Sequence, residues 1–90
     1  MESSPMISKE KHPDGWAALM YELTDAQEHL ARLISEIESD LEYGEGNFRV
    51  DLGHVYSHLN RAWHCRNAAD ALPEAEWRVA SLFPTDIEPT

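Results

Sequence analysis

The sequence has few of the features that mark secreted, membrane-bound or nucleic-acid-binding proteins. A single cysteine, Cys65, excludes a disulfide within the chain and suits a reducing compartment. The sequence has no run of eighteen apolar residues, which a membrane span would need. Its N-terminus also lacks the basic-then-apolar order of a signal peptide. Only 7 Lys and Arg stand against 17 Asp and Glu, and the net charge of -10 repels nucleic acid phosphates and anionic membranes. We therefore expect a cytoplasmic protein that binds neither nucleic acid nor membrane.

The length and the composition along the chain predict one small domain. Ninety residues support a modest core, and such a core is often supplemented by oligomerisation. Residues 1–13 mix Ser, Pro, Lys and Glu without a period, so we interpret them as a flexible N-terminal tail. Residues 14–84 form the predicted helical domain, and residues 85–90 form a C-terminal tail.

A strong helical period runs over residues 14–43. The apolar side chains recur within about 140° of arc and predict one long helix, although Thr24 and Asp25 leave a bend open. Gly44 and Gly46 are suited to end it. The stripe is wider than one neighbouring helix covers. Its members are Trp16, Leu19, Met20, Leu23, Ala26, Leu30, Leu33, Ile34, Ile37 and Leu41.

A second helical period spans residues 51–72. Asp51 suits an N-cap, and Pro73 cannot continue the helix, so both ends have a chemical reason. The connector, residues 44–50, is short enough to fold the two helices into an antiparallel hairpin. The apolar members of the second period are Leu52, Val55, Tyr56, Leu59, Ala62, Trp63 and Ala69.

This hairpin predicts which residues face each other. If Leu41 meets Leu52, facing residue numbers add to about 93, which places Leu30 near Trp63. Arg66 interrupts the apolar stripe of the second helix and needs a partner there. In this register it lies beside Gln27 and Glu28, which we predict to hold it by a buried ion pair or hydrogen bond.

A short third helix is predicted over residues 74–83, between two prolines. Its inner side carries Ala75, Val79, Leu82 and Phe83. Trp77 and Ala80 then point away and are candidate interface residues. The surplus apolar surface predicts an all-α hairpin plus a short third helix that dimerises into a four-helix-type bundle, so a homodimer and a further protein partner are expected.

Histidines and carboxylates provide the only candidate metal site. His54 and His58 are spaced i, i+4 on one side of the second helix, an arrangement that can hold zinc when a third ligand converges. Asp51 lies one turn earlier, and Glu36 on the first helix supplies a carboxylate in the predicted register. Acids near His54, His58 or His64 would also favour the imidazolium form and make association sensitive to pH.

No constellation of catalytic residues is apparent. Glu36, Asp40 and Asp51 resemble the magnesium-binding carboxylates of helical nucleotide pyrophosphatases. However, His54 stands where a second carboxylate is needed, and the first-helix acids are unevenly spaced, so no family is assigned. The acids also cluster too unevenly to imitate the phosphates of a nucleic acid. We expect a non-catalytic interaction or regulatory module without a cofactor, or alternatively a metal-binding protein that uses His54 and His58.

Overall fold

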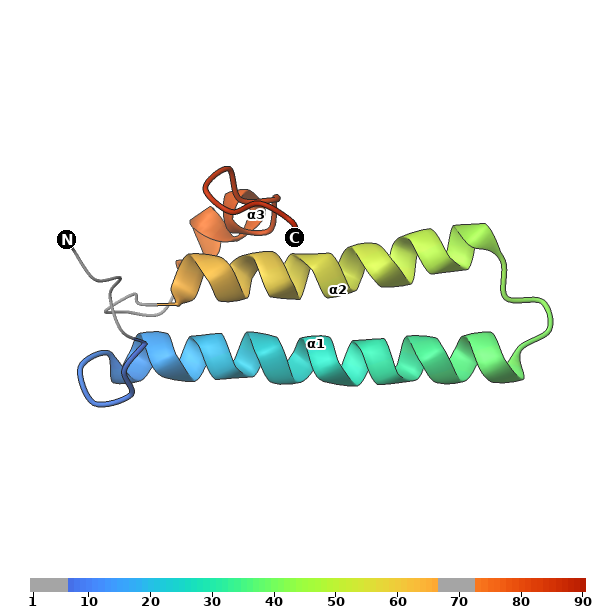
Figure 1. The fold of residues 1–90 in the computed structure, drawn as a ribbon, viewed down its shortest axis with the longest axis horizontal. Helices are drawn as coiled ribbons and strands as arrows, with labels where there is room; N and C mark the ends of the chain where they lie inside the picture. Colours follow the sequence, from blue (N-terminus) through green and yellow to red (C-terminus); the bar gives the residue numbers. More distant parts are fainter. Residues whose placement is uncertain (1–6, 67–72) are drawn as a thin grey trace.

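The computed structural model describes residues 7–66 and 73–90, and in these ranges every regular element is a helix. The long helices α1 (Pro13–Ser39) and α2 (Glu45–Cys65) run antiparallel, side by side (Figure 1). A 3₁₀ turn, η1 (Glu74–Glu76), leads into α3 (Trp77–Ala80), which packs on the side of α2 away from α1 (Figure 1). The predicted all-α hairpin with a short third helix is confirmed. Neither long helix contains a stretch apolar enough to span a bilayer.

Helix α1 is continuous and ends four residues before the predicted end. Pro13 occupies the first turn, where its missing N–H costs nothing, and Asp14 adds a favourable negative charge there. Asp40 takes an extended backbone conformation with φ -105° and ψ 104°. Its Oδ1 accepts a hydrogen bond from the Glu42 amide at 2.9 Å, so the side chain supports a turn that stops the helix.

Helix α2 begins at Glu45 rather than at Asp51. Gly44 is the extended N-cap residue, and its amide donates to Asn47 Oδ1 at 3.1 Å. Asp51 is therefore not an N-cap; its Oδ2 accepts a hydrogen bond from the Tyr43 hydroxyl at 2.7 Å. Desolvation is the main cause, and the hydrogen bond to Asp51 the second cause, that raises the pKa of Tyr43 to about 12. The predicted extension of α2 over residues 67–72 lies outside the described residues.

The early start of α2 shifts the register of the hairpin. Glu22 contacts His58, and His29 contacts both His54 and His58. Facing residue numbers therefore add to between 80 and 87, not to about 93 as the longer predicted connector required. The predicted proximity of Leu30 and Trp63 is wrong, because a shift of about ten residues corresponds to roughly 15 Å along a helix.

The buried core is small and leaves much of the predicted apolar stripe exposed. Within residues 7–66 and 73–90, seven apolar residues are at most 7% exposed, and these are Leu19, Ala26, Leu33, Val55, Ala62, Cys65 and Ala80. By contrast, Leu30, Ile34 and Ile37 keep 43%, 51% and 49% of their surface. Trp16 and Trp63, both expected in the core, are only half-buried. The hairpin thus retains an apolar surface that its own chain does not cover in the described ranges.

The third helix packs against the hairpin with the side that was predicted to face away from it. Ala80 is buried against the hairpin, so it is not an exposed interface residue, while Val79 and Leu82 face outward. Asn60 Nδ2 donates to the Ser81 carbonyl at 2.8 Å and fixes the end of α3 to α2. Trp77 remains 44% exposed, but Arg61 stacks on its ring at 4.7 Å. These polar contacts with α2, which the apolar pattern does not reveal, decide the orientation.

Candidate metal centre

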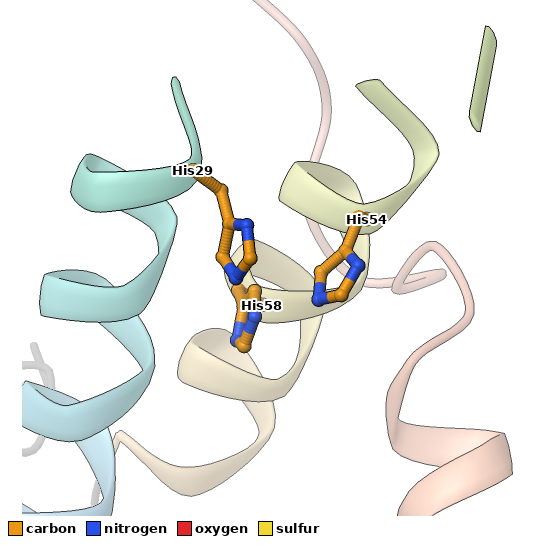
Figure 2. Close-up of side chains that lie close together, drawn as sticks. All are labelled: His29, His54 and His58. Atoms are coloured by element: carbon orange, nitrogen blue, oxygen red, sulfur yellow. The ribbon is translucent and has the colours of Figure 1, made fainter. Parts of the chain in front are cut away.

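Three histidines from the two long helices converge in the space between α1 and α2. His29 comes from α1, and His54 and His58 come from α2 (Figure 2). One ring nitrogen from each lies within 4.8 Å of the others. The ring centroids are 4.2 to 5.1 Å apart. Such an arrangement places three potential nitrogen ligands around one point.

His58 is the buried member of the cluster, and its Nδ1 has two neighbours: Glu22 Oε1 at 2.7 Å and Arg61 Nη2 at 3.2 Å. We assign the proton to Nδ1 from the shorter contact, because a carboxylate oxygen can only accept. The lone pair is then on Nε2, which is buried and has no hydrogen-bond partner. A carboxylate on one ring nitrogen is the usual arrangement for a histidine that binds metal through the other. An unsatisfied buried acceptor is otherwise costly.

Glu22 is in turn held by Arg61, and both side chains are buried. Arg61 Nε donates to Glu22 Oε2 at 2.6 Å, and its Nη2 lies 3.3 Å from Oε1. Its Nη1 donates to Ser81 Oγ at 2.6 Å, which connects the pair to the segment after α3. The bidentate contact compensates the buried carboxylate and fixes its position behind His58.

His54 is the exposed member, and its surroundings favour the neutral ring. Burial of part of the ring is the first cause that lowers the pKa of His54. Electrostatic interactions with His29, His58 and Arg61 lower it further, and the interaction with Asp25 opposes them. The prediction that acids hold this ring as imidazolium is wrong for His54. A neutral imidazole has the lone pair that metal binding requires.

The predicted carboxylate ligands lie beside the cluster rather than in it. Glu36 and Asp51 line a cavity of about 150 Å³ next to His54, and His29, Arg32 and Leu33 complete its wall. His58 does not line this cavity. The structure therefore brings Glu36 and Asp51 close to His54 but puts His29, which was not predicted, where a first-helix carboxylate was expected.

Arg66 is not paired with Glu28 or Gln27. Its Nη1 donates to the Trp63 carbonyl at 2.7 Å, and its Nη2 lies 3.8 Å from Asp86 Oδ2 near the surface. The guanidinium also stacks over the Trp63 ring at 3.7 Å. The shifted register moves Arg66 beyond the reach of the predicted partners. The buried arginine–carboxylate pair of this hairpin is Arg61 with Glu22, one turn from the cluster.

The three rings are stacked on one another, with interplanar angles of 19° to 29°, so they must reorient to bind one ion. Zinc–nitrogen bonds of about 2.0–2.1 Å in a tetrahedral site place ligand atoms about 3.3 Å apart. The present limit of 4.8 Å must therefore shorten by roughly 1.5 Å, which rotation of exposed His54 and half-buried His29 can supply. His58, fixed by Glu22, can remain in place.

Comparisons of the chain with protein-family models, with curated proteins and with solved structures find no match. The structure is that of a helical hairpin with a cluster of three histidines between its two long helices.

Proposed function

We propose that this protein binds one divalent transition-metal ion, of the zinc class, through His29, His54 and His58. The observation that carries the proposal is His58 Nε2, a buried nitrogen without a hydrogen-bond partner, on a ring that lies against the rings of His29 and His54. Imidazole ligands suit zinc, copper and nickel, whereas magnesium and calcium prefer oxygen.

The ion would act by joining the two halves of the hairpin. His29 is on α1 and the other two ligands are on α2, so coordination adds a cross-link to a pair of helices that share a small core. An ion that binds only the folded chain stabilises it by about 2.7 kcal/mol at one hundred times its dissociation constant. The proposed function is thus a non-catalytic regulatory module whose folded population depends on metal supply.

Titration of the tag-free, chelator-treated protein with zinc tests the proposal. We expect one ion per chain in the wild type and a large loss of affinity in His29→Asn, His54→Asn and His58→Asn. His64→Asn is the matched control, because His64 is exposed on the same helix outside the cluster. Zinc binding that survives all three cluster substitutions, or that is absent from the wild type, would refute the proposal.

A second proposal concerns self-association through the apolar surface. His29 and His54 are in contact on one face of the helix pair. The side chains on the other side of each helix therefore lie together on the second face of the pair. We name this second face the apolar face. Its members are Leu23, Leu30, Ile34 and Ile37 of α1 with Phe48 and Leu59 of α2, each 39% to 51% exposed.

We propose that the apolar faces of two chains pack into a homodimeric four-helix-type bundle, located in the cytoplasm. Support comes from the number of exposed apolar side chains that recur on this face along both helices. Single apolar residues scattered over a surface would need no such explanation. The buried Cys65 is compatible with a reducing compartment. A further protein partner would have to compete with the second chain for this surface.

Sedimentation analysis at micromolar concentration tests the dimer. We expect a dimer for the wild type and a monomer for Ile34→Glu, because the charge would be buried between the two chains. Val79→Glu is the matched control, since Val79 is 68% exposed on α3, outside the apolar face. A monomeric wild type, or dissociation by both variants alike, contradicts the proposal.

A further inference from the structure

We infer that Asp25 is the fourth ligand of the proposed metal ion, an inference that rests on the metal-binding function. Asp25 precedes His29 by one turn of α1, just as His54 precedes His58 by one turn of α2. Residues four apart share one side of a helix. The two pairs therefore face each other across the hairpin and together supply the four ligands that a tetrahedral ion needs.

Asp25 lies outside the group whose ligand atoms are all within 4.8 Å of one another, but it approaches the buried member of that group, His58. Its Oδ2 lies 3.9 Å from Nε2 of His58, the buried nitrogen without a hydrogen bond. Two ligand atoms of a tetrahedral zinc ion are separated by about 3.3 Å, so the pair is already near the required spacing. The Asp25 side chain is 26% exposed and can rotate into place.

Two other carboxylates near the cluster, Glu22 and Asp51, are engaged elsewhere, and Glu36 lines the neighbouring cavity that His58 does not reach. Glu22 accepts from Arg61 and lies on Nδ1 of His58, on the ring edge opposite the metal-facing nitrogen. Asp51 accepts from the Tyr43 hydroxyl. Asp25 is the carboxylate that the described structure places within 4.0 Å of His58 Nε2.

A shell of three imidazoles and one carboxylate determines the chemistry of the ion. Four protein ligands leave no position for water or substrate, which is typical of structural zinc sites, whereas catalytic zinc sites keep one position open. The ion would hold α1 and α2 together and would not activate a bound water. Glu22 behind His58 then serves as the outer partner that orients the ring.

Titration with cobalt(II), followed by visible absorption, tests this inference. The wild-type complex should show the intense bands of tetrahedral cobalt, and added thiocyanate should not change them because no position is open. Asp25→Ala should bind cobalt at least about tenfold more weakly, the lower end of the loss seen for outer-shell partners. Its spectrum should shift with thiocyanate, which takes the vacated position.

Glu28→Ala is the matched control, because Glu28 is an exposed carboxylate of α1 next to His29 in sequence. The control should keep the wild-type affinity and spectrum. Wild-type behaviour of Asp25→Ala, or a thiocyanate response in the wild type, would overturn the role of Asp25. If the histidine variants also leave cobalt binding unchanged, or the wild type binds none, the proposed metal function fails with it.

Discussion

The buried charges beside His58 are the most demanding residues of this small fold. Glu22 and Arg61 are 5% and 7% exposed, so each would be costly without the other. Their contact also determines which nitrogen of His58 carries the proton. A pair of this kind adds little stability compared with a well-packed apolar pair, so its presence next to three histidines favours a functional reason for keeping it.

Arg61→Ala should destabilise the protein strongly. The substitution leaves the Glu22 carboxylate buried without its partner and removes the stacking contact with Trp77. We expect a loss of about 3–5 kcal/mol in the free energy of unfolding, measured by urea denaturation. The control Arg66→Ala removes a contact near the surface and should cost at most about 1 kcal/mol. Equal losses in both variants would contradict the assigned burial of the Arg61 pair.

The metal-free protein should lose stability as the pH falls below about 6.5. The pKa of His54 is lowered in the folded chain, so the unfolded chain binds more protons in this range and folding becomes less favourable. The facing groups are Asp25 and His29 on α1 and His58 and Arg61 on α2. Unfolding midpoints at pH 5.5 and 7.5 check this, and His54→Asn should reduce the difference. An unchanged difference in that variant would contradict the shift.

At the scale of the elements, the start of α2 determines the site. In the predicted register His58 faces Ser35, and Glu36 is the nearest carboxylate. In the observed register His58 faces Asp25. The fold class followed from the apolar periods of residues 14–43 and 51–72. The site did not, because the hydrogen bond between Gly44 and Asn47 starts the helix six residues early. The matching i, i+4 pairs Asp25–His29 and His54–His58 are the signal that sequence reasoning missed.

Substitution by alanine should have opposite effects at Gly53, inside α2, and at Gly44, the N-cap that precedes it. Gly53 lies inside the helix, and an added Cβ would meet no atom within 4 Å, so Gly53→Ala should stabilise by about 0.5–1 kcal/mol. Gly44 is the N-cap, where alanine is disfavoured, so Gly44→Ala should destabilise, by up to roughly 1 kcal/mol. Thermal unfolding of both variants measures the signs. A stabilising Gly44→Ala would argue against the assigned start of α2.

Over the whole molecule, the two faces of the hairpin differ in character. The histidines and their carboxylates occupy one face, and the apolar face occupies the other. If both proposals hold, this division would let one short chain combine a metal-dependent folded state with a surface for a second copy.

Zinc should raise the melting temperature of the wild type. At one hundred times the dissociation constant, about 2.7 kcal/mol corresponds to roughly 10–20 °C for a domain of this size. Scanning calorimetry with and without zinc measures the shift. His58→Asn should lose the response, and His64→Asn should retain it. A shift of equal size in His58→Asn would mean that zinc stabilises the fold from another position.

Anomalous X-ray diffraction at the zinc absorption edge tests the central claim most directly. Crystals grown with one equivalent of zinc should show one strong peak per chain, bonded to His29, His54 and His58 at about 2.0–2.1 Å. A peak confined to other histidines, such as half-buried His12 or exposed His64, or no peak between α1 and α2, would contradict it.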